Sequence, residues 1–291
     1  VSDRRRCPQP YPVPLREMKL LLLLSLPAAT ALLMPTAARL RSSPAVASSR
    51  QAMMSLDRRS ALGVLAALPV AFVSTSPAVA ATDKVVIFGG SGYVGAHAAQ
   101  MLLGQGAQVV SVSRKSSADQ ADKVKAILGT DLKLDYVSLD ASTADLTAVL
   151  AGATAVISCV GIAPGGANQR AGNGAVNARI ADAAKAAGIG RFVYLGVASE
   201  LANGPIKFIF GDYVKGKAEA EAAVAKDFGA AALVLKPGII GGAPPGEIRP
   251  PGPPGMTPVS VEAVAAAAVA GALGKKTGSV DGNAAIAAAS A

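Results

Sequence analysis

The sequence predicts an α/β fold in which a doubly wound parallel sheet forms a single compact domain over residues 82–291. Short apolar runs alternate with helix-like segments from residue 84 onward, and the runs are continuously apolar, as in strands buried on both faces. Strands that alternate with helices imply right-handed crossovers and parallel pairing. A glycine-rich turn directly after the first run supports the same fold.

Six strands are expected, each a short run of β-branched and other apolar residues. They are KVVIF (84–88), AQVVSV (107–112), DYVSL (135–139), AVISCV (155–160), RFVYLGV (191–197) and AALVLKPG (231–238). Helices are expected from the glycine turn to Leu103, then at ADKVKAIL (121–128), LTAVLAG (146–152), ARIADAAKAAG (178–188) and KAEAEAAVAKDFG (217–229). A last helix is expected at VSVEAVAAAAVAGALG (259–274), with Ser260 or Thr257 as its cap.

The stretch GGAPPGEIRPPGPPG (241–255) interrupts this alternation. Its density of proline and glycine is incompatible with a helix or a central strand. We therefore expect a loop over residues 241–258, at the carboxyl edge of the sheet, that covers a bound substrate.

The positive charge is concentrated in the first part of the chain. The 291 residues carry a formal net charge of +9, but residues 1–81 hold 10 Lys and Arg against 3 Asp and Glu, a net of +7. Residues 82–291 hold 18 against 16, a net of +2. Since a nearly balanced domain has no broad basic surface, nucleic acid is not an expected partner.

Residues 1–81 have the layered composition of a targeting presequence. From Met18, the expected start, a short basic region and an apolar region follow each other as in a secretory signal, and residues 39–59 have the Arg- and Ser-rich composition of a transit peptide. Arg58-Arg59 then precedes a second apolar run that ends in Ala78-Val79-Ala80. That arrangement resembles a twin-arginine export signal with its cleavage site.

This series resembles the presequence of a thylakoid-lumen protein in an alga with a complex plastid. We therefore expect a plastid location in the thylakoid lumen, with the stroma or another organelle such as the mitochondrion as the alternative. One uncleaved anchor at Ala61–Val73 is a further alternative, but that run is short for a membrane span. The mature domain is not expected to span a membrane.

Cysteine and histidine offer little chemistry here. Cys7 and Cys159 lie on opposite sides of the expected cleavage site, so the mature domain has no internal disulfide. Cys159 lies in an apolar run, which favours a buried, inert thiol. His97 is the one histidine and is assigned to surface or packing, so we expect neither a metal site nor a histidine-based triad.

Gly89, Gly92 and Gly95 form G-x-x-G-x-x-G directly after the first strand. The first two glycines allow a tight turn and close approach to a pyrophosphate, and Gly95 lets the helix pack against the sheet. The helix N-terminus offers N–H groups to phosphates. This pattern predicts dinucleotide binding in a Rossmann fold; the alternative is a structural turn that has lost its ligand.

The end of the second strand bears on the choice of cofactor. An NAD site usually has an acidic residue there for the ribose 2′-OH, whereas this chain has Ser113-Arg114-Lys115. Because a guanidinium pairs with a 2′-phosphate, NADP(H) is favoured over NAD(H). The alternative is that Arg114 and Lys115 are ordinary solvated charges. Asp140, after the third strand, is placed either to reach the adenine edge or to cap a helix.

Tyr213 and Lys217 lie four residues apart, so they share one face of a helix. An ammonium beside a phenol is expected to lower the tyrosine pKa, and such a tyrosine can exchange a proton with an alcohol oxygen during hydride transfer. Ser199, at the end of the fifth strand, is a candidate to hold the substrate oxygen. The alternative is a half-buried aromatic at a helix start and a solvated lysine.

Together these features resemble the short-chain dehydrogenase/reductase superfamily, in particular its atypical branch, which includes complex I 39-kDa-subunit-like and quinone-synthesis-associated proteins. The matching parts are the glycine turn at 89–95, Asp140, the strand ending in Gly161, VNARIADAAKAAGIGRFVYLGVAS (176–199), Tyr213-x-x-x-Lys217, KPGIIGG (236–242) and PVSVEAVAAAAVAGAL (258–273).

The resemblance implies roles for individual residues. Tyr213 would be the general acid/base, Lys217 its activator and Ser199 the partner of the substrate oxygen, while Asn177 is either a fourth member or a helix cap. The implied cofactor-binding residues are Gly89, Gly92, Tyr93, Val94, Gly95, Arg114, Asp140, Gly161 and Lys217.

Two functions follow from these patterns. The first is an NADP(H)-dependent oxidoreductase that acts on a hydroxyl, carbonyl or quinone-like small molecule. The second is an accessory or assembly protein of a membrane redox complex, which binds NADP(H) without turnover. The atypical branch includes members of both kinds.

Overall fold

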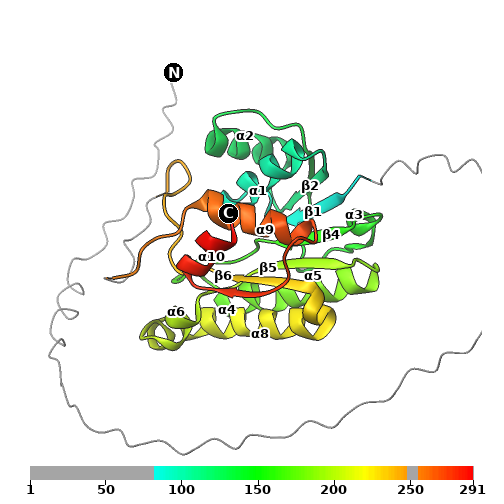
Figure 1. Ribbon diagram of the computed structural model, residues 1–291. Coiled ribbons are helices and arrows are strands. Elements are labelled where there is room, and N and C mark those ends of the chain that lie inside the picture. Colours follow the sequence, from blue (N-terminus) through cyan, green and yellow to red (C-terminus); the bar gives the residue numbers. More distant parts are fainter. Residues whose placement is uncertain (1–81, 248–254, 291) are drawn as a thin grey trace, which may run out of the picture. The chain divides into compact units, whose positions relative to one another are not determined.

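The structure, a computed structural model, describes residues 82–247 and 255–290. The expected presequence (1–81) and the middle of the expected substrate loop (248–254) lie outside the described residues. The expected doubly wound parallel sheet is confirmed, and its described part forms one α/β domain (Figure 1).

All strands of the sheet are parallel, in the order β3-β2-β1-β4-β5-β6-β7. They are β1 (Lys84–Phe88), β2 (Gln108–Ser113), β3 (Asp135–Ser138), β4 (Ala155–Ser158), β5 (Arg191–Leu195), β6 (Ala232–Lys236) and β7 (Gly278–Asp281). The order reverses between β1 and β4, and a cleft at the carboxyl ends of the strands is expected at this switch point.

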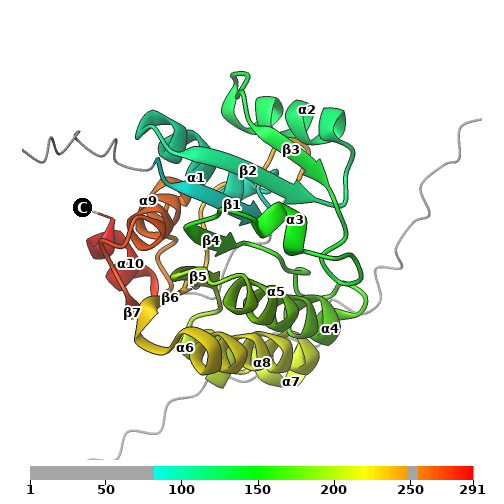
Figure 2. The same ribbon diagram turned by 90° about the vertical axis from the view of Figure 1, so that its right-hand side faces the viewer.

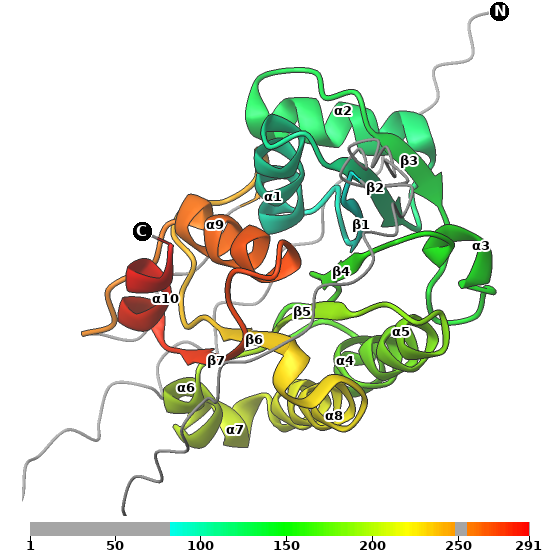
Figure 3. The ribbon, with the colours of Figure 1, turned by 45° about the vertical axis from the view of Figure 1, so that its right-hand side comes forward.

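Helices connect the strands and cover both faces of the sheet (Figure 3). They are α1 (Tyr93–Gly104), α2 (Ser117–Leu128), α3 (Thr147–Leu150), α4 (Gln169–Asn173), α5 (Ala175–Ala186), α6 (Ser199–Asn203), α7 (Ile206–Ile209), α8 (Gly211–Phe228), α9 (Val261–Ala272) and α10 (Asn283–Ala289), with a 3₁₀ turn, η1, at Gly229–Ala231.

Side chains that alternate along each strand feed two apolar cores. Val85 and Ile87 of β1 point toward a core that includes α1, α9 and α10, whereas Val86 and Phe88 point toward one that includes α3, α5 and α8. Since both faces of the central strands are buried, their continuous apolar character has a direct physical explanation. Gly271 lets α9 lie close to the sheet, because a Cβ there would come within 2.5 Å of the Leu233 side chain.

Capping residues set the start of α9, as expected, and the start of α2, which begins four residues earlier than expected. The Ser260 hydroxyl accepts a hydrogen bond from the N–H of Ala263, so Ser260 rather than Thr257 caps α9. Ser116 caps α2 in the same way, through the N–H of Asp119, and that helix ends at Gly129 in a left-handed conformation.

Several elements were not expected from the sequence. A seventh strand, β7, and a helix, α10, follow α9, and the short helices α4, α6 and α7 lie in segments for which no helix was expected. Figure 2 shows α4, α5 and α8 side by side below the sheet. Within residues 82–247 and 255–290, no helix has both the length and the apolar character needed to cross a bilayer.

Candidate functional site

The turn between β1 and α1 has a shape that only glycine allows. Gly89 has a φ of +80°, and a Cβ on Gly95 would lie 2.3 Å from the Gly89 carbonyl oxygen. A Cβ on Gly90, a residue outside the expected triplet, would lie 2.5 Å from the Ser111 hydroxyl. The backbone of the turn therefore lies directly against the start of α1 and the neighbouring strand, with no side chain between them.

The N-terminus of α1 opens into a cleft of about 230 Å³. Gly92 caps the helix, and its N–H donates back to the Gly89 carbonyl at 2.9 Å. The N–H groups of the first helical turn, which have no acceptor within the helix, lie at this end. Gly92, Tyr93, Val94 and Gly95 all line the cleft, so four of the expected cofactor-binding residues come together here.

Residues from the ends of four other segments complete the cleft. They come from the loops after β4, β5 and β6 and from α8: Cys159, Leu195, Gly196, Tyr213, Lys217, Pro237, Gly238 and Ile240. The cleft therefore brings the expected Tyr213–Lys217 pair to the glycine turn, at the carboxyl ends of the neighbouring strands β1 and β4, where the strand order reverses.

Lys217 is a buried amine with a single fixed partner. Its Nζ donates to the Leu195 carbonyl at 2.9 Å and lies 5.4 Å from the centre of the Tyr194 ring. Burial disfavours the charged form and lowers the pKa of Lys217 to about 8. Gly161, another expected cofactor residue, lies beside this amine, because a Cβ there would approach Nζ to 3.3 Å.

The pKa of Tyr213 shifts in the direction opposite to the one expected. The sequence predicted that Lys217 would lower the pKa of the tyrosine, but burial raises the pKa of Tyr213. The expected direction was therefore wrong, because the Lys217 ammonium is turned toward the Leu195 carbonyl while the phenol is shielded from water. The result is a phenol that keeps its proton at neutral pH.

Cys159 lines the cleft as well. Burial raises the pKa of its thiol to about 12, which agrees with the expected inert, protonated thiol. Its backbone, rather than its sulfur, defines the local shape, since a Cβ on Gly89 would come within 3.1 Å of the Cys159 carbonyl group.

Two of the expected polar residues lie outside this cleft. The Ser199 N–H donates to the carboxylate of Asp281 in β7 at 2.9 Å, and Ser199 is not among the residues that line the cleft. Asn177 is fully buried, where it accepts from the Ser158 hydroxyl and donates to the carbonyls of Val160 and Asn173. It therefore ties α5 to the end of β4 instead of facing a ligand.

Arg114 and Asp140 lie near each other at the carboxyl ends of β2 and β3. Asp140 accepts hydrogen bonds from the hydroxyl and the N–H of Ser142, and these bonds, with a smaller contribution from Arg114, hold the pKa of the carboxyl below its usual range. These bonds close a turn at residues 140–144 and cap no helix, because the next helix, α3, begins only at Thr147. The Ser91 hydroxyl donates to Ser113 at 3.3 Å and so joins the glycine turn to the segment that carries Arg114.

His97 packs inside the domain, in agreement with the packing role expected for it. Its ring lies edge-on to Tyr93 at 5.4 Å, and its Nε2 is buried without a hydrogen-bond partner. Burial lowers the pKa of His97, while Glu262 of α9 opposes that shift.

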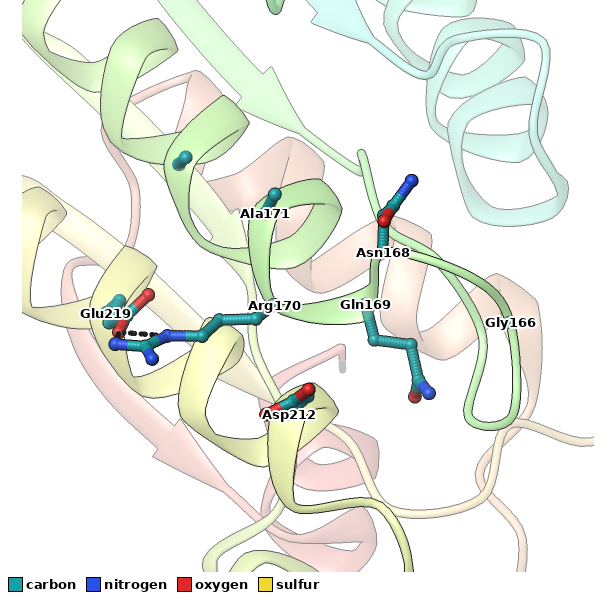
Figure 4. A pocket seen from close by; sticks show the side chains of 8 residues that line it. Gly166, Asn168, Gln169, Arg170, Ala171, Asp212 and Glu219 are labelled. Atoms are coloured by element: carbon teal, nitrogen blue, oxygen red, sulfur yellow. Dashed lines mark hydrogen bonds and ion pairs between the residues drawn. The ribbon is translucent and has the colours of Figure 1, made fainter.

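A second, more open cleft of about 530 Å³ lies between α4 and the first turns of α8 (Figure 4). Its lining includes the polar residues Asn168, Gln169 and Asp212 beside an ion pair between Arg170 and Glu219. Asp212 directly precedes Tyr213, so the two clefts adjoin along α8.

Sequence reasoning missed several residues at the first cleft. Leu195 supplies the carbonyl that fixes Lys217, and Asn283 of α10 binds the backbone at Gly238. The contribution of Leu195 is a backbone atom, and Asn283 lies in a segment for which no element was expected. Neither carried a signal in the sequence.

The residues of the first cleft fit a dinucleotide. The glycine turn leaves a surface of backbone that a Cβ at Gly90 or Gly95 would fill, and the start of α1 presents N–H donors beside it. Lys217 and Tyr213 line the same cleft.

Comparison with known proteins also indicates a dinucleotide-binding protein. The sequence profile of a protein family described as NAD(P)H-binding matches residues 89–273, more than half of the chain. An uncharacterized chloroplastic protein of Arabidopsis thaliana is 31% identical over 161 residues, which cover 55% of this chain. The chain spans 52% of the length of that relative.

Solved structures share the fold at low sequence identity. A Bacillus halodurans protein described as an NAD-dependent epimerase/dehydratase is 17% identical, with 72% of this chain and 98% of that chain covered and a TM-score of 0.55. The Bordetella bronchiseptica enzyme WbmH in complex with NAD⁺ is 18% identical, with 69% and 75% covered and a TM-score of 0.51. MoeE5 in complex with UDP-glucose and NAD is 18% identical, with 67% and 74% covered and a TM-score of 0.53.

Proposed function

Since the chain belongs to the NAD(P)H-binding family, we propose that it is an oxidoreductase that reduces or oxidises a carbonyl, hydroxyl or quinone-like small molecule. One observation carries this proposal: Tyr213 and Lys217 line the same cleft as the glycine turn. A protein that only stores a dinucleotide needs the turn but has no use for a proton-exchanging tyrosine beside it.

Each part of the cleft has a distinct task in this proposal. The N–H groups at the start of α1 bind the pyrophosphate. Lys217, held by the Leu195 carbonyl, orients the ribose and the part of the cleft that carries Tyr213. When bound, the nicotinamide supplies or accepts a hydride. The Tyr213 hydroxyl donates a proton to the substrate oxygen in reduction and takes it back in oxidation.

The protonation of Tyr213 favours one direction of this chemistry. Because burial raises the pKa of Tyr213, the phenol is protonated at neutral pH and is a proton donor in its resting form. Carbonyl reduction requires a donor at this place, whereas alcohol oxidation requires an acceptor. We therefore assign the reductive direction as the faster one near neutral pH.

NADP(H) is the proposed cofactor. Arg114 follows the end of β2, and the Ser91–Ser113 hydrogen bond places that end beside the glycine turn. A guanidinium at this position pairs with the 2′-phosphate that distinguishes NADP from NAD. The loop over residues 241–258 is proposed to cover the substrate, since Ile240 at its start lines the cleft.

The proposed location is a plastid, with residues 1–81 as presequence and residues 82–291 as the mature domain. The chloroplastic relative from Arabidopsis thaliana supports a plastid, and the twin-arginine-like segment at Arg58-Arg59 supports the thylakoid lumen. A fluorescent fusion of the full chain that stayed in the cytosol would contradict this assignment.

The Tyr213→Phe variant tests the proposed function. The full chain is incubated with NADPH and a panel of aldehydes, ketones and quinones, and oxidation of the cofactor is followed by absorbance. We expect the variant to lose about 100-fold or more in kcat, because it lacks the general acid, while its affinity for NADPH is unchanged.

Tyr136→Phe is the matched control. Tyr136 is a half-buried tyrosine of the edge strand β3 and does not line the cleft, so its loss of a hydroxyl should leave turnover unchanged. If Tyr213→Phe turned over the panel as fast as the wild type, Tyr213 would not be the acid. NADPH binding without turnover of any carbonyl would instead favour the accessory protein.

A further inference from the structure

The side of the cleft opposite the glycine turn is formed by two stretches of backbone that run next to each other. Gly238 and Ile240 line the cleft, and an isolated parallel bridge joins Ile240 to Val259. Within it, the Gly241 N–H donates to the Val259 carbonyl at 2.7 Å, and the Val259 N–H donates to the Ile239 carbonyl at 2.9 Å. We call residues 238–242 and 256–259 together the cleft wall.

The cleft wall also touches the glycine-turn side. A Cβ on Gly242 would lie 2.4 Å from the Tyr93 hydroxyl, and a Cβ on Gly238 would lie 2.7 Å from the Met256 sulfur. The two stretches therefore pack against each other at one end and against Tyr93 at the other. Tyr93, Gly238 and Ile240 line the cleft, so the position of the first stretch bears directly on its width.

One side chain from another part of the fold holds both stretches. The Asn283 Oδ1 accepts from the Gly238 N–H at 2.8 Å. Its Nδ2 donates to the Ile239 carbonyl at 3.1 Å and to the Thr257 carbonyl at 2.8 Å. Asn283 is thus bonded to both stretches of the cleft wall.

The contacts require a carboxamide rather than any polar group. A carboxamide offers two donors and an acceptor from one planar group, and Asn283 uses both donors and the acceptor. A carboxylate of the same shape would place an acceptor against the Ile239 and Thr257 carbonyls. The site therefore distinguishes Asn from Asp although the two have nearly the same size.

The element that carries Asn283 is itself anchored at the same edge of the sheet. The Asp281 carboxylate accepts from the Ser199 N–H at 2.9 Å and lies 3.7 Å from the Lys236 Nζ. Asn283 follows two residues later, at the start of α10, and the buried Ile286 fixes that helix in the apolar core. The Asn283 carboxamide therefore belongs to a segment whose position in the fold is fixed.

We propose that Asn283 is a positioning residue that sets the width of the cleft on its substrate side by holding the two stretches of the cleft wall together. This inference rests on the proposed function. It predicts that Asn283 governs how well the carbonyl or quinone substrate fits, while the glycine turn and Lys217, which Asn283 does not contact, govern the cofactor.

The test compares the full chain with Asn283→Asp, Asn283→Ala and the control Asn203→Asp, which makes the same charge change at an exposed position of α6. NADPH and phenanthrenequinone are the probes, and deuterium exchange is followed at Gly238, Gly241 and Val259. We expect KM for the quinone to rise about tenfold in Asn283→Ala and further in Asn283→Asp, with kcat and NADPH affinity retained.

The outcomes separate this inference from the proposed function. Faster exchange confined to the cleft wall, together with the raised KM, supports the clamp; an unchanged KM in both Asn283 variants overturns it. Lost protection that extends to β1 and β2 also overturns it, since that is general destabilisation. If the wild type reduces no quinone, the proposed function fails for this substrate class, and exchange at the cleft wall alone decides whether Asn283 is a clamp.

Discussion

Arg114 depends for its position on a buried glutamine two turns away. The Gln120 amide donates to the carbonyls of Lys115 and Val137 and accepts from the Ser111 hydroxyl, so it fixes the segment that leaves β2. Asp140 lies close enough to Arg114 for their charges to interact, but its carboxylate is already bound by Ser142. The backbone next to Arg114 is therefore held in place, and the exposed guanidinium is accessible to a phosphate.

At this scale we predict the effect of Arg114→Ser on cofactor choice. The dissociation constant for NADPH should rise about 10- to 100-fold, because a charge-assisted pair to the 2′-phosphate is lost, while that for NADH should stay the same. Thermal melts measure both, since a ligand at 100 times its dissociation constant adds about 2.7 kcal/mol of stability.

Lys133→Ser is the control for this experiment, because it removes an exposed positive charge from the loop before β3. Equal weakening of NADPH and NADH by Arg114→Ser would mean that Arg114 does not read the 2′-phosphate. Equal effects of Arg114→Ser and Lys133→Ser on NADPH would mean that only the net charge matters.

At the scale of elements, α4 and α8 cross at a point where a side chain does not fit. A Cβ on the buried Gly216 would lie 2.6 Å from the Arg170 carbonyl oxygen and 3.1 Å from the Asn173 Cβ. Asn173 in turn binds both the N–H and the carbonyl of Ile162, in the loop after β4. The crossing therefore connects α8, which carries Tyr213 and Lys217, to that loop.

We predict that Gly216→Ala destabilises the protein by about 1–3 kcal/mol, because the added methyl overpacks this crossing. Urea unfolding of the two proteins measures the difference. Gly211→Ala is the matched control in the same helix: nothing lies within 4 Å of a Cβ there, so we expect no loss and up to about 1 kcal/mol of gain. Equal stability of Gly216→Ala and wild type would mean that α4 moves away from α8 without cost.

The elements that were predicted from the sequence are those with a strong apolar pattern. The run KVVIF is buried along almost its whole length, and the glycine turn after it is read directly from its residues. By contrast, β7 is the segment GSVD at the sheet edge, largely exposed and with little apolar character, so nothing in the pattern distinguishes it from a loop.

The sequence likewise predicted only part of the candidate site. The spacing of Tyr213 and Lys217 predicted that both would lie on one face of a helix, and both line the cleft. Ser199 was expected beside them, but it binds Asp281, which belongs to the strand that the sequence did not reveal. The pKa direction of Tyr213 depends on burial by distant segments, which spacing along one helix cannot show.

For the whole molecule, the burial of Lys217 couples stability to pH. Its pKa is about 8 in the folded protein and 10.5 in the absence of burial. Below about pH 8 both states carry the charge, and the folded state bears the cost of an ammonium shielded from water. Between these two values the unfolded state binds more protons, so the free energy of unfolding rises with pH.

We predict that Lys217→Met removes this rise. Urea unfolding from about pH 7 to about pH 10 should show the wild type gaining roughly 2–3 kcal/mol relative to the variant as the pH increases. The unpaired Leu195 carbonyl of the variant adds an offset that does not change with pH. Burial raises the pKa of Cys159, Tyr194 and Tyr213, so these groups make the free energy of unfolding fall, not rise, as the pH passes their unfolded values, and they are present in both proteins being compared. Parallel curves would show that Lys217 titrates outside it.

The order of the strands has a consequence for how the chain acquires its shape during synthesis. Taken in chain order, β2 lies beside β1, β3 lies beside β2, β4 lies on the other side of β1, and β5, β6 and β7 extend that side one at a time. A chain that emerges from the ribosome can therefore lay each new strand on an edge that already exists. Asp281 and Asn283 follow all the strands that they brace. The nucleotide-binding half consequently forms early, and the substrate side becomes rigid only when the final segment docks.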